Sequence, residues 1–249
     1  RVEIEQIVHC LRLMSAGRAG EFFLSMPLFF ASHTRLDLIK MGHAKTLPEL
    51  IEALGHTPYA AILSRVSAAE GTIPISRIEN ALYSYLIRGL LELIEETQGD
   101  LHDQLADLCG IQIDAQNVSR ILRLKTYFHA SPDRIREELL PWGGSIPKKS
   151  REAMIEAPTP EEAARIFWTT RAGKLLPESQ RTFLHDLYHR VPYFNARRHI
   201  HYSVHPMVVL MSYIMLTDVE VDDIINIIEG IRYGMPPEQI KPMLVLDDQ

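Results

Sequence analysis

Apolar residues recur at intervals of three and four along most of this chain. The segment ISRIENALYSYLIRGLLELIEE (75–96) is the clearest case, because its apolar residues fall on one stripe of a helix: Ile78, Leu82, Tyr85, Leu86, Leu90, Leu93 and Ile94. This 3.6-residue period is typical of an amphipathic helix, whereas the strict two-residue alternation of a strand is hard to find in the sequence. The pattern therefore predicts an all-α protein.

Several helix starts are marked by capping residues. Thr46 and Thr159 each open a T-x-x-E capping box, in which a hydroxyl and a carboxylate satisfy backbone amides that the helix leaves without partners. Ser131 is followed by proline and aspartate, which combines a serine cap, a proline in the first turn and an acid near the positive end of the helix dipole. These signals place helix starts directly after residues 46, 131 and 159.

One stretch of the chain is written twice, about a hundred residues apart. NVSRILRLKTYFHASPDRIREEL (117–139) and DDIINIIEGIRYGMPPEQIKPML (222–244) share an Ile/Leu-rich helix, an aromatic, a break, a proline with an acid, and a short helix. A fainter copy, IEQIVHCLRLM (4–14), opens the chain. We call these three segments the tails. Internal repeats of this kind indicate a fold built from similar units.

The segments that precede the second and third tails are also similar to each other. KTLPELIEALGHTPYAAIL (45–63) parallels PTPEEAARIFWTTRAGKLL (158–176), and we call these segments the heads. The order predicts the tail of a first helical repeat in residues 1–44, a second repeat in residues 45–150 and a third in residues 151–249. Chance similarity between amphipathic helices is the alternative.

The repeat also predicts which side chains share a position. To align the second and third tails, one residue of the second tail has to be omitted in the break between its two helices. Four residues of the second tail (Ile121, Leu122, Ile135 and Leu139) then align with four of the third (Ile227, Ile228, Ile240 and Leu244). Their helical spacing predicts that all eight are buried on a core face.

Composition narrows the class of protein. With 46% hydrophobic and 23% charged residues, the 249-residue chain is predicted to be globular. Its net charge of −6 gives no electrostatic case for binding nucleic acid. The apolar run 207–216 is too short to cross a bilayer and is predicted to be a core helix. Cys10 and Cys109 are predicted to be buried thiols in a reducing compartment, and no signal peptide is recognised.

The sequence HDLYH holds the one candidate metal site. His185 and His189 are one helical turn apart, the spacing of the H-E-x-x-H helix of zinc peptidases. Asp186 stands in place of the glutamate that acts as general base, and its side chain is one methylene shorter. Candidates for a third ligand follow: His199, His201 and His205. Interhelical or surface hydrogen bonding is the alternative, so we expect no stoichiometric zinc and keep a zinc-dependent hydrolase as the alternative function.

Two further segments invite a binding interpretation. GGSIPKKS (143–150) is similar to a phosphate loop, but Lys148 replaces the second glycine, Pro147 removes an amide, and no strand precedes it. A polar linker explains it better, so neither a cofactor nor a bound nucleotide is expected. FNARRHIH (194–201) gathers Arg197 and Arg198 into a basic patch that suits a negatively charged partner, with a solvated helix end as the alternative. The near absence of catalytic motifs favours an interaction protein.

The order of these motifs resembles a known family. VHPMVVLMSYIMLTDVEVDDIINIIEGIRYGMPPEQI (204–240) resembles the C-terminal signature of the rotor adaptor of V/A-type ATPases, which is the C subunit in bacteria and archaea and the d subunit in eukaryotes. The segment 117–144 is similar to the middle repeat of that family, and the segment 49–63 to its start. The family has three complete units, whereas the first is only half present here. An N-terminal portion of the natural protein is therefore expected to be missing.

The resemblance implies an all-α protein of three similar lobes around a pseudo-threefold axis, shaped like a funnel. It implies no active site and no cofactor. The implied partners are the central axle subunits and the membrane ring of proteolipid subunits, and the implied place is the cytoplasmic side of the membrane, peripherally bound. The implied role is to transmit torque between axle and ring. Whether protons or sodium ions are moved, and whether the complex pumps or synthesises ATP, does not follow from the sequence.

The partner surface is expected to be polar, because no apolar run is long enough for a membrane anchor. The candidate interface residues are Arg197, Arg198 and Arg232, the last in the turn that closes the C-terminal helix. Exposed charge contacts of this kind weaken as salt rises. We therefore expect a monomer whose binding to the ring falls with ionic strength. Reversal of Arg197 and Arg198 together is expected to weaken assembly while the thermal melt stays nearly unchanged.

Overall fold

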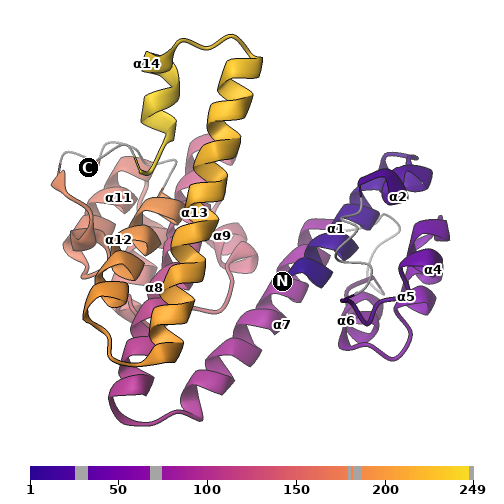
Figure 1. Cartoon of the computed structure of the whole chain (residues 1–249), viewed down its shortest axis with the longest axis horizontal. Coiled ribbons are helices and arrows are strands. Elements are labelled where there is room, and N and C mark those ends of the chain that lie inside the picture. Colours follow the sequence, from indigo (N-terminus) through magenta and orange to yellow (C-terminus); the bar gives the residue numbers. More distant parts are fainter. Residues whose placement is uncertain (26–32, 68–74, 179–180, 182–186, 247–249) are drawn as a thin grey trace. The chain divides into compact units, whose positions relative to one another are not determined.

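The computed structural model describes residues 1–25, 33–67, 75–178, 181 and 187–246 (Figure 1). Within these ranges every regular element is a helix, which confirms the predicted all-α fold class. Among the helices described there, none combines the length and the apolar character needed to cross a membrane. The chain divides into two compact units, Arg1–Gly89 and Leu90–Gln249. The predicted division into three repeats stays a prediction.

The first unit is built mainly from short helices around α1. Its elements are α1 (Val2–Ser15), η1 (Ala19–Glu21), α2 (Phe22–Ser25), α4 (Leu38–His43), α5 (Leu47–Leu54), α6 (Pro58–Ser67) and the first part of α7 (Ile75–Glu95). Thr46 caps α5 as predicted, since its hydroxyl accepts a hydrogen bond from Glu49 N (3.4 Å). The Glu49 carboxylate in turn accepts one from Lys45 N (2.8 Å), so two amides at the helix start are satisfied.

The second unit is organised around one long helix, α8 (Figure 1). Its elements after the end of α7 are α8 (Gly99–Phe128), α9 (Pro132–Glu138), α10 (Lys148–Glu156), α11 (Pro160–Thr169), η2 (Gly173–Leu175), α12 (Leu187–Tyr202), α13 (Pro206–Arg232), α14 (Pro237–Ile240) and η5 (Lys241–Met243). Helix α8 packs against α11, α12 and α13. Ser131 and Thr159 cap α9 and α11, accepting hydrogen bonds from Arg134 N (3.3 Å) and Glu162 N (3.2 Å).

The second and third tails end in similar hydrogen bonds. Asn117 on α8 donates to Leu140 O (3.0 Å) and accepts from Leu140 N (2.9 Å). On α13, the Asp223 carboxylate accepts from Val245 N (3.0 Å). Asn117 and Asp223 occupy the same position in the aligned tails, and so do Leu140 and Val245. In both places one polar side chain, buried in a long helix, ties the returning chain to that helix.

The predicted burial of the eight aligned residues is only partly correct. Ile121, Leu122, Ile135 and Ile240 are buried, and Leu139 and Leu244 are partly buried. The prediction is wrong for Ile227 and Ile228, whose side chains are 36% and 59% exposed. The physical reason is tertiary: Ile121 and Leu122 lie in a cluster with residues of α10, α11 and α12. In the described part of the chain, no comparable cluster includes Ile227 or Ile228.

Candidate functional site

The three predicted interface arginines are exposed, but they do not form one patch. Arg197 and Arg198 are neighbours near the C-terminal end of α12. Arg232 is the last residue of α13. A short connection joins α12 to the start of α13, and α13 has 27 residues, so it is about 40 Å long. The pair and Arg232 therefore lie toward opposite ends of α13.

Arg198 stands beside a partly buried polar cluster centred on Asp107 of α8. His199 Nε2 lies 2.9 Å from Asp107 Oδ2, and an Arg171 guanidinium nitrogen lies 2.7 Å from Asp107 Oδ1. Burial alone would raise the pKa of Asp107, but the hydrogen bond with His199 and the charges of Arg171, His199 and Arg198 outweigh it and hold the pKa below its ordinary range. Arg198 therefore has a role inside the molecule as well as an exposed side chain.

This cluster predicts a measurable pH dependence of stability. A carboxyl group whose pKa is lowered by folding stabilises the protein above its unfolded pKa of about 3.9, and this contribution is lost as pH falls through the folded pKa. We expect Asp107→Asn to unfold more easily than the wild type at pH 6, with the difference shrinking below about pH 4. Urea unfolding at several pH values measures the loss of stability at pH 6 and its decrease at lower pH. A difference that stays constant with pH would contradict the assignment.

The histidines do not gather into a metal site in the described part of the chain. His185 lies outside the described residues, and His189 Nε2 lies 3.7 Å from Asp222 Oδ2. His199 is bound to Asp107, and the His205 ring nitrogen Nε2 lies 2.9 Å from Asp100 Oδ2. Among the described residues, no three His, Cys, Asp or Glu side chains are placed to hold a metal ion. The structure thus gives the zinc hydrolase no support.

The segment that is similar to a phosphate loop binds a carboxylate of the protein itself. Asp114 is fully buried on α8, and Oδ1 accepts a hydrogen bond from Gly143 N (2.6 Å). Oδ2 accepts from Ser145 Oγ (2.7 Å) and Ile146 N (2.8 Å). The loop therefore fixes the connection between α9 and α10 onto α8, and its amides already have an anionic partner.

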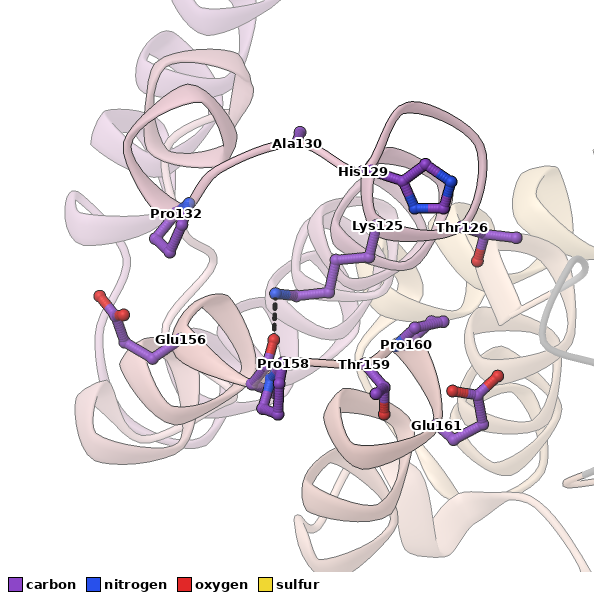
Figure 2. Close-up of a pocket in the computed structure, with 11 residues that line it drawn as sticks. Lys125, Thr126, His129, Ala130, Pro132, Glu156, Pro158, Thr159, Pro160 and Glu161 are labelled. Carbon is purple, nitrogen blue, oxygen red and sulfur yellow. Dashed lines mark hydrogen bonds between the residues drawn. The ribbon is translucent and has the colours of Figure 1, made fainter.

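A hollow in the second unit is lined in part by a buried lysine (Figure 2). Lys125, close to the end of α8, donates to Ile155 O (2.7 Å) and Ala157 O (2.5 Å), the carbonyls at the end of α10. Burial lowers the pKa of Lys125, against the opposing charge of Glu156. Since the amine is held by two carbonyls, it joins α8 to the α10–α11 junction, and the hollow presents no evident chemistry.

The feature that sequence analysis missed is an apolar face on α13. We define the α13 stripe as Met207, Leu210, Ile214, Thr217, Val221, Ile224, Ile228 and Ile231. Thr217 is half-buried and the other seven side chains are exposed. The core face lies on the opposite side of the helix and includes Val208, Ser212, Met215, Val219 and Asp223. The segment 207–216 was predicted to be a core helix, and this is wrong for its four exposed residues, Met207, Leu210, Tyr213 and Ile214.

The spacing of the α13 stripe was visible in the sequence. Its members alternate at intervals of three and four through four heptads, which is the seam pattern of a helix that packs along another helix. Because the core face is also largely apolar, hydrophobicity alone did not separate the two sides. The molecule therefore offers two kinds of candidate contact: exposed arginines and a long apolar seam.

Comparison with known proteins identifies the family of the chain. The model of the ATP synthase (C/AC39) subunit family matches residues 1–243. The C subunit of the A-type ATP synthase of Archaeoglobus fulgidus is 28% identical over 229 residues, which cover 87% of this chain and 61% of that protein. The proteins of the same name from Pyrococcus furiosus and Methanosarcina mazei are 26% and 23% identical over 211 and 248 residues. These cover 82% and 99% of this chain, and 56% and 68% of the relatives.

No solved structure matches the chain. The chain spans 56–61% of the length of the first curated relatives that it matches. The family match nevertheless extends over almost all of its residues, through both compact units. The chain belongs to the ATP synthase (C/AC39) subunit family.

Proposed function

We propose that this protein is a non-catalytic central-stalk subunit of a rotary V/A-type ATPase, which links the axle to the membrane proteolipid ring and transmits torque. The observation that carries the proposal is the family match over residues 1–243. The relatives are named as subunits of A-type ATP synthases, and this chain acts as such a subunit rather than as an enzyme. We place it peripherally at the cytoplasmic side of the membrane.

A part that transmits torque has to resist bending and twisting, and the second unit has features that suit this demand. Helix α8 has 30 residues and α13 has 27, and both pack against α12. Hydrogen bonds of three buried side chains on α8 hold other segments of the chain against this helix; the three residues are Asn117, Asp114 and Lys125. Hydrogen bonds that satisfy buried groups fix one arrangement of the helices, since breaking them leaves buried polar groups unpaired.

We further propose the three-repeat division, with the lobes arranged as a funnel. Besides the bonds of Asn117 and Asp223, a second aligned pair supports it. Arg120 donates to Glu138 O (2.8 Å), and Asn226, at the aligned position, donates to Met243 O (3.4 Å). Two matching hydrogen bonds at the same spacing are a stronger argument for common architecture than similar hydrophobic periods.

The arginines are proposed as contacts with the partners. An adaptor needs contacts at two ends, and Arg197 with Arg198 lies toward one end of α13 while Arg232 lies at the other. Each exposed charge contact contributes about 0.2–1 kcal/mol and is screened by salt. Several contacts of this kind give an interface that is strong at low ionic strength and weak at high ionic strength.

The proposal is tested by assembly. We expect the tagged protein to pull down ATPase subunits from native membranes, and its binding to the isolated proteolipid ring to fall steeply between low and high salt. Arg197→Glu is expected to weaken ring binding with no change in melting temperature, since its side chain is exposed. Arg198 is a poorer test site than the sequence indicated, because its charge also acts on Asp107.

The matched control is Arg123→Glu, which reverses another exposed arginine on α8. It should leave ring binding unchanged. A pull-down without ATPase subunits would contradict the proposed function. Ring binding that ignores both salt and Arg197→Glu would remove only this patch from the interface.

A further inference from the structure

The α13 stripe occupies the same register as a stripe on each of the other two tail helices, α1 and α8. The aligned residues are Ile4, Ile7, Leu11 and Met14 on α1; Ala115, Val118, Leu122 and Lys125 on α8; and Val221, Ile224, Ile228 and Ile231 on α13. All eight on α1 and α8 are buried, for example Val118 at 1% and Leu122 at 4% exposure. Their counterparts Ile224 and Ile228 are 54% and 59% exposed.

On the other two helices, head residues are among those that bury this stripe. The stripe of α1 shares a core cluster with three residues of the head 45–63, and the apolar stripe residues of α8 share one with three residues of the head 158–176. These residues are Leu50, Leu54 and Leu63 in the first case, and Ala163, Phe167 and Leu176 in the second. They occupy the same three positions of the aligned heads. In both cases the stripe of a tail helix therefore shares a core cluster with a head.

The heads 45–63 and 158–176 of a second copy are not available to cover the stripe. The sequence contains two heads, and each already lies in a core cluster with a tail helix of the same chain. Covering the α13 stripe with a head from another copy would uncover α1 or α8. Exposing buried leucine and isoleucine side chains costs about 1.5–3 kcal/mol each, so the exchange gains nothing.

We propose that the α13 stripe is the docking surface for a third head, supplied by polypeptide that the longer members of this family have beyond the region matched here. The curated relatives extend well past that region, since it covers 61% and 56% of their length. The inference rests on the repeat and not on the partners of the rotary complex. Docking of this head removes the exposed apolar face of α13 from water.

The stripe defines the chemistry of this head. It is a helix pair with apolar residues at the three positions that correspond to Leu50, Leu54 and Leu63. Lys125 of α8 donates to two carbonyls directly before its head, Ile155 O and Ala157 O, whereas α13 has Ile231 and α1 has Met14 at that position. The third head therefore resembles the head 45–63 more than the head 158–176 where it meets Ile231. Exposed acidic side chains, among them Glu220 and Glu229, flank the stripe and favour basic residues at the rim of the head.

The test uses the whole chain and two probes. One is a labelled peptide of residues 37–67, which contains the head 45–63. The other is the part of the Archaeoglobus fulgidus relative that lies outside the matched region. We expect both probes to bind, and the double variant Ile224→Asp/Ile228→Asp to weaken binding at least roughly tenfold, because it places two charges in an apolar contact. Fluorescence anisotropy measures binding, and the melting temperature should not fall, since both side chains are exposed.

Leu93→Asp is the matched control, because Leu93 is a comparably exposed leucine on α7 and does not belong to the stripe. It should leave binding of both probes unchanged. Probes that fail to bind, or that bind the double variant as well as the wild type, would overturn the proposal. So would a stable dimer in sedimentation that the double variant dissociates, since the occupant would then be a second copy. Pull-down of ATPase subunits is independent of these outcomes.

Discussion

Replacing Asp114 by alanine is expected to lower the free energy of unfolding by about 3 kcal/mol or more. The change removes the acceptor for three donors: Gly143 N, Ser145 Oγ and Ile146 N. A buried donor without a partner costs about 1–3 kcal/mol. Ile146 is buried, while Gly143 and Ser145 are partly buried and reach some water, so the sum falls well short of three full penalties.

The asparagine variant separates the hydrogen bonds from the charge. Burial raises the pKa of Asp114, against the hydrogen bonds of Ser145, Ile146 and Gly143 and the charge of Arg151. With a raised folded pKa, the pH-dependent part of the contribution of Asp114 to stability is fully present below its unfolded pKa and is lost as pH rises through the folded pKa, whereas the hydrogen bonds to the carboxylate remain. Asp114→Asn removes this pH dependence but keeps one carbonyl oxygen, so its loss of stability should lie between wild type and alanine.

Urea unfolding at pH 7 is the measurement for both variants, with the signal taken from the second unit. Ser84→Ala, a partly buried hydroxyl on α7, is a useful comparison for a small change in a helix. An alanine variant of Asp114 that loses less than about 1 kcal/mol would mean that the loop does not depend on this carboxylate.

The local structure around Asp114 was predictable, but its role was not. The segment 143–150 was interpreted as a polar linker, and residues 143–147 do lie between α9 and α10, while α10 begins at Lys148. The partner of that loop is an acid 29–32 residues earlier, in the interior of α8. No local pattern connects the two, because a charged residue on a long helix is normally read as a solvated position. Long-range hydrogen bonds of this kind become visible only when the helices are placed.

The helix starts at Thr46, Ser131 and Thr159 were predicted correctly for the opposite reason. A capping bond joins residues that are three apart, so the sequence contains both partners within one turn. Burial is different. Ile121 and Ile227 are the same residue in the same register of similar helices, yet one is buried and the other is exposed. What decides their burial is the element packed against them, which lies elsewhere in the chain or outside it.

The candidate interface shows the same contrast between features set by neighbouring residues and features set by the packing of helices. Arg197 and Arg198 are neighbours in the chain and lie together on α12, whereas the position of Arg232 at the far end of α13 became clear only from the helix itself. The charge of Arg198 on α12 acts on Asp107 on α8, and the sequence gives no indication of this long-range effect.

Gly110→Ala is expected to destabilise the second unit by about 2 kcal/mol, although alanine in a helix interior normally stabilises by about 1 kcal/mol. An added Cβ on Gly110 would lie 2.5 Å from Gly143 O, and a Cβ on Gly143 would collide with the backbone of Gly110. Both neighbours are backbone, so α8 and the loop have to separate, which stretches the hydrogen bonds to Asp114.

Gly89→Ala is the matched control, because Gly89 is in helix α7 and its Cβ would meet nothing within 4 Å. Thermal unfolding should show a lower melting temperature for Gly110→Ala and an equal or higher one for Gly89→Ala. Equal gains in both variants would show that the close approach of α8 to this loop is absent in solution.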